Sequence, residues 1–196
     1  MRSRSGWRSL FLVLAGAVVV SACTNAQAAQ PTSSAITIIR GSVFEFAQYV
    51  DPSTGYEIAV PKDATMVHSP DGLLVSFQYE SESVFRGTYT LTVEIKPNSP
   101  AGSAQELLAQ VTAGEKDLSP VKDIFVDEAK SRAVFRSFAT EPGEHCARPR
   151  ALALAVMHYD VGLVVHIFSD AEGRCDVESL PETLPVLGSI RFADTG

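Results

Sequence analysis

The chain has 196 residues, a formal net charge of −7 at pH 7 and 45% hydrophobic residues. This acidic balance argues against a nucleic-acid-binding protein, because contacts to phosphates need clustered lysine and arginine. It also disfavours adsorption of the protein onto anionic lipid. The length suits one folded domain with a sizeable hydrophobic core.

The first 22 residues are typical of an export signal. Three arginines and no acidic residue precede an apolar run at residues 10–20, which is only about half of the ~20 apolar residues that a membrane span needs. The sequence Val-Ser-Ala-Cys at residues 20–23 resembles the lipobox of bacterial lipoproteins, whose cysteine carries the lipid. We therefore expect a lipid anchor at Cys23, with an ordinary cleaved signal and an uncleaved anchor as the alternatives.

The expected organisation is a lipoprotein signal peptide at residues 1–22, a lipidated flexible tether at residues 23–35 and a single α+β domain at residues 36–196. The tether is small and polar, without hydrophobic periodicity. Loss of the three signal arginines would take the formal charge from −7 to −10. We expect the domain on the extracytoplasmic side of a cell membrane or an outer membrane. Thr24 after the cysteine favours the outer membrane in a Gram-negative host, but the sequence leaves the host open.

Two further cysteines, Cys146 and Cys175, lie in the expected extracytoplasmic domain. Thiols outside the cytosol commonly end as disulfides, so we expect this pair to be joined. A bridge that closes a loop of about 30 residues stabilises a fold by roughly 3–4 kcal/mol. A metal site that includes His145 is the alternative, although the spacing of these residues does not support it.

Alternating apolar and polar residues predict two β-strands, at residues 73–79 and 88–96. The polar segment between them, residues 80–87, predicts a hairpin with a long exposed loop. Val84, Phe85 and Arg86 lie at the tip of this loop, and apolar and arginine side chains are the types that anchor interfaces. These three residues are therefore candidates for binding a protein partner. The alternative is that Phe85 folds back onto the edge of the sheet.

The sequence of the rest of the domain predicts further strands and two helices. Ser-Ala-Gln-Glu at residues 103–106 has the spacing of a capping box, so we expect a helix from there to about residue 113. Two apolar strands are expected at residues 151–159 and 163–169, on either side of a turn at residues 160–162. Both faces of these strands are apolar, which indicates central strands covered on both sides. The alanine-rich face leaves room for a helix to approach closely. A C-terminal helix at about residues 176–188, interrupted by prolines, is expected to cover one face of the sheet, and the helix at residues 103–113 the other. Shorter strands are expected at residues 124–126 and 133–139.

This order of elements resembles the PsbP-like family, including the LpqN-type lipoproteins of actinobacteria. The resemblance extends over residues 55–192, from an early Gly-Tyr-Glu-Ile-Ala-Val-Pro strand to a final Leu-Gly-Ser-Ile-Arg-Phe ending. It implies an α+β fold in which a central antiparallel β-sheet is flanked by helices, as an α/β/α sandwich. It also implies an accessory or binding role, and it provides no catalytic motif.

Few residues form a pattern typical of catalysis or metal binding. His158 and His166 fall on the two strands of the last expected hairpin, where a three-residue turn would place them on one face, about 7–8 Å apart at the backbone. A metal or proton-coupled site is one interpretation, and hydrogen-bonded histidines of the core or rim are the other. Asp170, Glu172 and Asp176 lack the regular spacing of an EF-hand and indicate a solvated acidic turn.

No nucleophile elbow, phosphate-binding loop or zinc-protease motif is found, so no enzyme activity, metal or cofactor is predicted. We therefore expect a cell-envelope lipoprotein that acts as a non-enzymatic binding or accessory module for a protein partner. A carrier of a small apolar ligand, which requires a cavity, is the first alternative. An envelope hydrolase, which requires a nucleophile beside a base, is the second.

Overall fold

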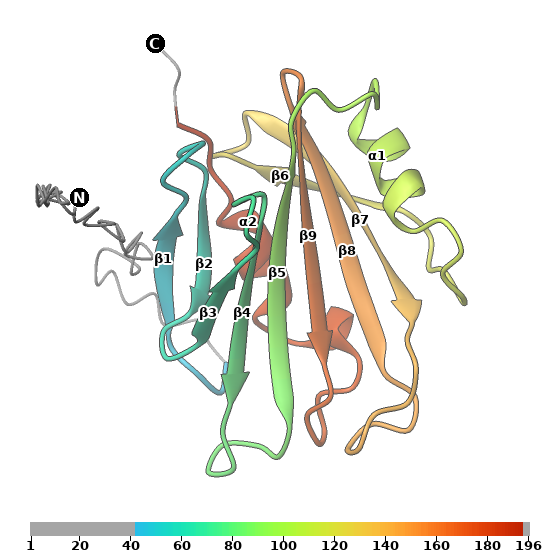
Figure 1. Cartoon of the computed structure of the whole chain (residues 1–196). Helices are drawn as coiled ribbons and strands as arrows, with labels where there is room; N and C mark the ends of the chain where they lie inside the picture. The colour runs from blue at the N-terminus through green and yellow to red at the C-terminus, as the bar shows by residue number, and fades with distance from the viewer. Residues whose placement is uncertain (1–41, 194–196) are drawn as a thin grey trace, which may run out of the picture.

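The computed structural model describes residues 42–193 of the chain (Figure 1). Within these residues nine strands, two α-helices and one short 3₁₀ helix are formed. The signal, the lipobox and the tether predicted at residues 1–35 lie outside the described residues, and so does the start of the predicted domain. These assignments stay predictions.

A seven-stranded antiparallel sheet is the centre of the structure, with the strand order β3-β4-β5-β9-β8-β7-β6. The two strands predicted on either side of the polar loop pair as a hairpin, with Phe77 opposite Leu91. The strands predicted as central are indeed inside the sheet, where they pair with each other and with neighbours on both sides. The strands are β3 (Thr65–His68), β4 (Leu74–Glu80), β5 (Thr88–Lys96), β6 (Lys122–Val126), β7 (Ser131–Ala139), β8 (Arg150–His158) and β9 (Val161–Ser169).

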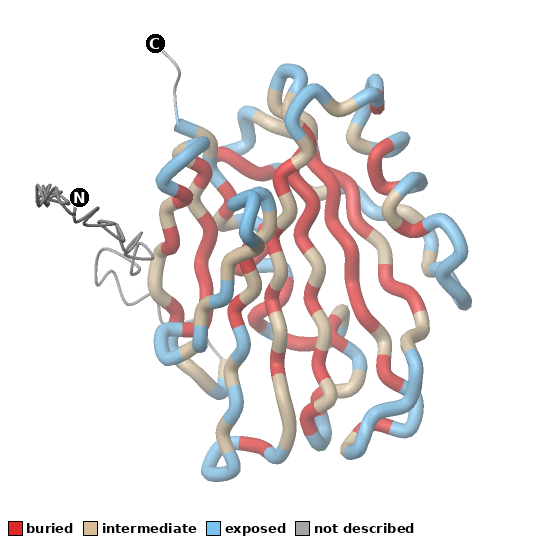
Figure 2. Tube along the Cα trace, in the orientation of Figure 1, coloured by how far each residue is buried: buried red, intermediate tan, exposed pale blue. Residues whose placement is uncertain are grey.

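One face of the sheet packs against a second layer, which contains a two-stranded hairpin. This hairpin consists of β1 (Phe46–Val50) and β2 (Glu57–Pro61). The 3₁₀ helix η1 (Val177–Ser179) and the helix α2 (Thr183–Gly188) complete the layer. Alternate side chains of the central strands and the inward side chains of this layer form one hydrophobic core. Figure 2 shows that buried residues are concentrated along the central strands of the sheet.

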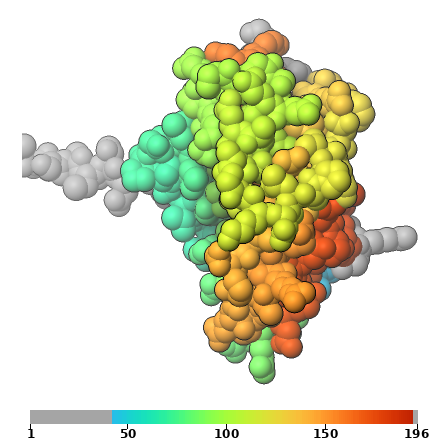
Figure 3. Space-filling view, turned by 90° about the vertical axis from the view of Figure 1, so that its right-hand side faces the viewer, coloured from blue at the N-terminus to red at the C-terminus, as the bar shows by residue number. Residues whose placement is uncertain are grey.

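The opposite face carries the helix α1 (Ala104–Val111), over β7, β8 and β9. Leu107 and Leu108 of the helix are fully buried against the alanine-rich face of β8, so the predicted close approach of a helix to this face is present. The side chain of Ser103 accepts a hydrogen bond from the backbone N–H of Glu106, at 3.2 Å, which confirms the helix cap. Glu106 in turn accepts from the backbone N–H of Gly102, one residue before the cap. Figure 3 shows α1 and the segment after it on the surface of this side of the molecule.

The predicted fold class needs one correction. The antiparallel sheet is present and a helix lies on each face, but these helices have only eight and six residues. The single helix predicted at residues 176–188 is divided, because Leu180 precedes a proline and adopts extended backbone angles of −71° and 135°. The β1–β2 hairpin shares the cover of that face with these short helices, so the protein is richer in β-structure than the predicted α/β/α sandwich.

Candidate functional site

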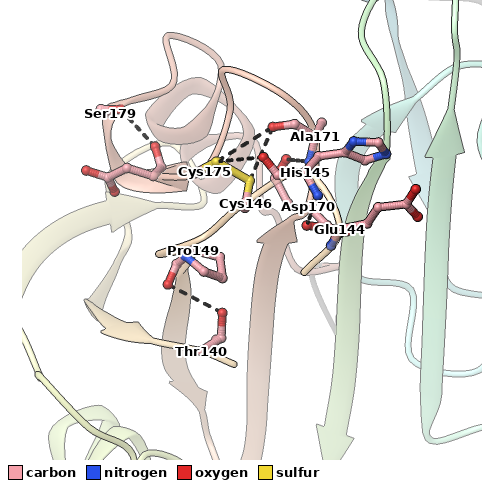
Figure 4. Close-up of a disulfide and its surroundings, with 11 residues drawn as sticks. Thr140, Glu144, His145, Cys146, Pro149, Asp170, Ala171, Cys175 and Ser179 are labelled. Atoms are coloured by element: carbon pink, nitrogen blue, oxygen red, sulfur yellow. Dashed lines mark hydrogen bonds between the residues drawn. A yellow bond between two sulfur atoms is a disulfide. The ribbon is translucent and has the colours of Figure 1, made fainter. Parts of the chain in front are cut away.

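Three loops meet at the end of the sheet where β4 ends and β5 begins, which is the lower end in Figure 1. They are the β4–β5 loop (residues 81–87), the β7–β8 loop (residues 140–149) and the segment after β9 (residues 170–176). We call these three loops the loop end. The disulfide between Cys146 and Cys175, whose Cα atoms are 5.5 Å apart, joins the second loop to the third (Figure 4). The predicted disulfide is therefore present.

Asp170 links the same loops by hydrogen bonds. Its carboxylate accepts from the backbone N–H groups of Glu144, at 3.1 Å, and His145, at 3.3 Å (Figure 4). Its backbone N–H donates to the carbonyl of Thr88, and the N–H of Glu172 donates to the carbonyl of Arg86. The loop end is thus one connected surface, in which the β4–β5 loop is held from two sides.

Two of the three acidic residues of the predicted acidic turn have structural partners, and the third, Glu172, is exposed. The carboxylate of Asp170 is occupied by backbone donors, and that of Asp176 caps η1 through the N–H of Glu178. No group of three or more histidine, cysteine or acidic side chains within residues 42–193 is arranged to hold a metal ion.

The three residues proposed to bind a partner differ in their surroundings. Val84 is 41% exposed and the side chain of Arg86 is also exposed, whereas Phe85 is only 9% exposed. The Phe85 ring lies 5.8 Å from that of Tyr79 and 6.3 Å from that of Phe44. The alternative geometry, in which Phe85 folds back onto the sheet, is the one observed. Val84 and Arg86 remain candidates for partner binding.

A buried arginine explains the position of Phe85. The guanidinium of Arg174 lies 5.1 Å from the Phe85 ring, 5.4 Å from Phe44 and 5.7 Å from Tyr89. Its Nη2 atom also forms an ion pair with Oε1 of Glu182, and the two side chains are 8% and 0% exposed. Burial lowers the pKa of Arg174, and the nearby Tyr89 opposes this effect. The cation therefore holds the β4–β5 loop against the body of the domain.

The other end of the sheet contains a cavity of about 350 Å³ between the sheet, the β1–β2 turn and the C-terminal segment. Its apolar lining includes Tyr56, Ile95, Leu163 and Phe192. The C-terminal segment is fixed there by backbone hydrogen bonds between Arg191 and the first residue of β2. We call this space the turn-end cavity.

Aromatic rings form one wall of the turn-end cavity. The His158 ring stacks on Phe192, with 4.3 Å between centroids and 8° between planes. Tyr159, which is 81% exposed, forms an edge-on contact with His158, with 4.6 Å between the ring centroids. Tyr159 has a φ of 55° because it and Asp160 form the turn between β8 and β9, and such turns require positive φ angles.

Hydroxyl and carboxylate groups form the rim. Ser53 and Thr54 line the cavity and donate hydrogen bonds from their side chains to Asp51, at 2.6 and 2.8 Å. Burial raises the pKa of Asp51, but these hydrogen bonds and those of the corresponding backbone N–H groups outweigh it and lower the pKa overall. Asp51 is 4% exposed, so a buried negative charge lies directly behind the rim.

The predicted arrangement of His158 and His166 is wrong. The β8–β9 turn has two residues, because His158 pairs with Val161, and the prediction had used a three-residue turn. A change of one residue in register moves a side chain to the other face of a sheet. His158 therefore faces the β1–β2 layer, whereas His166 lies on the face of α1, opposite Ala153 and Thr92. Burial lowers the pKa of His166, while Glu94 and Glu115 oppose this effect.

Two further observations concern the alternatives raised by the sequence. Within residues 42–193 no serine or aspartate side chain is hydrogen-bonded to the ring of His145, His158 or His166, which is the arrangement that a hydrolase of the predicted type would use. No helix in the described part of the chain has the length and apolarity needed to cross a bilayer.

Comparisons with known proteins identify the fold. No family model matches the chain, and no curated protein matches it in sequence. The structure is similar to the solution structure of cyanobacterial PsbP from Synechocystis sp. PCC 6803, with a TM-score of 0.52 and 20% identity, over 83% of this chain and 98% of that one. A protein of unknown function from Pseudomonas aeruginosa gives a TM-score of 0.41 and 11% identity, over 72% of this chain and 90% of the other. The similarity to cyanobacterial PsbP shows that the chain has a PsbP-like fold, as the sequence resemblance implied.

Proposed function

We propose that this chain is a lipoprotein of the cell envelope and that its folded domain is a non-enzymatic binding or accessory module for a protein partner. Lipid on Cys23 would attach the domain to the extracytoplasmic side of a cell membrane or an outer membrane. The proposal includes three further points: the signal at residues 1–22 is cleaved, residues 23–35 form a flexible tether, and the protein is related to the LpqN-type lipoproteins. The PsbP fold supports an accessory role, and the N-terminal sequence supports the anchor.

The main support for the proposal is that the three loops of the loop end are cross-linked to one another. A disulfide, the Asp170 carboxylate and the buried Arg174 all restrain loops that would otherwise move independently. The restrained surface presents Val84 and Arg86 to solvent. Binding to a pre-ordered surface loses less conformational entropy than binding to a mobile loop, so such a platform favours recognition.

Site-specific photocrosslinking tests the proposed partner site. A benzophenone amino acid at Val84 in the full-length lipoprotein should capture a defined envelope protein, and Arg86→Ala should weaken this capture. The same amino acid at Val67 is the matched control, because Val67 is a valine that is 53% exposed on the edge strand β3, away from the loop end. Equal capture from both positions, or capture that is unaffected by Arg86→Ala, would count against the loop end as the binding site.

The anchor has a separate test. Cys23→Ala removes the thiol to which the lipid would be attached, so this variant should not incorporate labelled fatty acid and should leave the membrane fraction. Continued incorporation of the label into the variant would refute the lipoprotein proposal. This outcome would leave the proposal about the loop end unaffected.

A carrier of a small apolar ligand is the second candidate function, and the turn-end cavity is the observation that favours it. Its volume of about 350 Å³ is near the lower bound of ligand pockets, which measure roughly 300–1,000 Å³. This volume is small for a lipid, so we place this function behind partner binding.

A further inference from the structure

The turn-end cavity combines aromatic walls with negative charge. Four rings line it: those of Tyr56, His158, Tyr159 and Phe192. Asp160 also lines the cavity, and its carboxylate has no hydrogen bond or ion pair within residues 42–193. The faces of aromatic rings and an unpaired carboxylate both attract cations.

The surrounding charges strengthen this preference. No lysine or arginine is among the residues that line the cavity. The two nearest basic residues along the chain are already paired: Lys96 lies 2.6 Å from Glu94, and Arg191 lies 3.4 Å from Glu128. The ionised Asp51 adds a second negative charge behind the rim, where burial reduces screening by solvent.

A buried polar atom gives an independent indication that the cavity takes a ligand. Tyr56 is 2% exposed, and its hydroxyl has no hydrogen-bond partner within the described residues. Buried polar groups nearly always have a partner in native proteins, and an unsatisfied one requires an explanation. A hydroxyl group of a bound ligand, or an ordered water, beside Tyr56 would supply the missing partner.

We propose that the turn-end cavity binds a small organic cation with an apolar body, such as a quaternary ammonium group. The apolar body of such a cation contacts Ile95 and Leu163, while its charged ammonium group faces the aromatic rings and Asp160. The cavity is at the opposite end of the sheet from the loop end, so this site does not depend on the proposed partner binding.

The charge preference is tested with two probes of nearly the same shape. Choline carries a trimethylammonium group, and 3,3-dimethylbutan-1-ol has an uncharged tert-butyl group in the same place. Each is titrated into isotope-labelled lipoprotein in a non-ionic detergent, and the amide signals of Tyr159, Asp160 and Val161 are followed by NMR. Choline should shift these signals saturably and bind about five- to thirtyfold more tightly than the alcohol.

Variants of the cavity locate the site. Asp160→Asn should weaken choline binding about two- to fivefold, because an exposed charge contributes modestly. Phe192→Leu keeps an apolar side chain but removes the ring, and it should weaken choline without affecting the alcohol. Asp63→Asn is the matched control, since Asp63 is an exposed aspartate at the far end of β2 and its loss should have no effect.

Each possible outcome decides the question. Equal affinity for choline and the alcohol would refute the preference for cations. Absence of saturable shifts, or choline binding that survives both cavity substitutions, would refute the site. The NMR spectrum of each variant shows whether it is folded, so loss of binding through unfolding is recognised directly.

Discussion

Replacing Glu182 by leucine should destabilise the domain strongly, because it leaves the charge of Arg174 buried without a counterion. The two side chains are 8% and 0% exposed, and water therefore cannot solvate the remaining guanidinium in the folded state. Breaking a buried ion pair from one side typically costs about 3–5 kcal/mol. For a domain of this size, each kcal/mol lowers the melting temperature by roughly 2–4 °C, so we expect a decrease of about 6–20 °C.

A second substitution shows whether the lost stability comes from the unpaired charge or from lost packing. With Arg174→Met added to Glu182→Leu, the thioether can pack on the rings of Phe85, Phe44 and Tyr89 that now surround the guanidinium. Replacement of a whole buried pair by apolar residues is often neutral or stabilising. The double variant should therefore be within about 1.5 kcal/mol of the parent protein or above it.

Urea unfolding with the disulfide intact measures both effects as free energies of unfolding. The exposed pair of Arg132 and Asp123, whose side chains are 67% and 51% exposed, is the control, and Asp123→Ala should cost no more than about 1 kcal/mol. A Glu182→Leu variant as stable as the Asp123→Ala variant would refute the buried pair. A double variant as unstable as Glu182→Leu alone would show that packing, and not the unpaired charge, is responsible.

Three other predictions concern stability. Reduction of the Cys146–Cys175 bridge, which spans 29 residues, should lower the free energy of unfolding by about 3–4 kcal/mol, and a thiol titration of the native pair should find no reactive group. Phe85→Ala should cost about 3–5 kcal/mol in urea unfolding, because this ring is buried; a loss below about 1 kcal/mol would contradict its position in the core. Folding lowers the pKa of Asp51 from its ordinary value of 3.8. The ionised carboxylate therefore stabilises the fold above pH 3.8, and this contribution is lost as the pH falls through the folded-state pKa. Asp51→Asn should reduce the free energy of unfolding at neutral pH, and the free energy of unfolding of this variant should fall less steeply in acid.

The regular part of the sheet was predictable because its strands repeat with a period of two residues. The segment 88–96 alternates over its whole length, and its prediction agrees with β5 at both ends. By contrast β3, at residues 65–68, was not predicted: it has four residues and two of them are exposed on the sheet edge, so no periodicity can be recognised. Short edge strands form because a neighbour such as β4 offers its backbone, and the sequence of the strand itself does not show this.

The candidate sites depended on contacts that no local pattern records. The cavity is formed by the β1–β2 turn, the β8–β9 turn and the last described residues, which are far apart in the sequence. The position of His158 at this cavity follows from a turn that is one residue shorter than predicted, because that residue decides which face of the sheet the ring occupies. Sequence reasoning recognised the residue but could not assign its side of the sheet.

Phe85 shows why a residue type alone does not identify an interface. In the sequence it belongs to the tip of a polar loop, which is where an interface anchor would be expected. In the structure it is held by Arg174, a residue 89 positions later that a local pattern would place in a solvated acidic turn. Arg174 in turn is paired with Glu182, which is also buried. The same ion pair therefore removes Phe85 from the surface and orders the loop, so Val84 and Arg86 are left as the exposed residues of a surface that is already fixed in place.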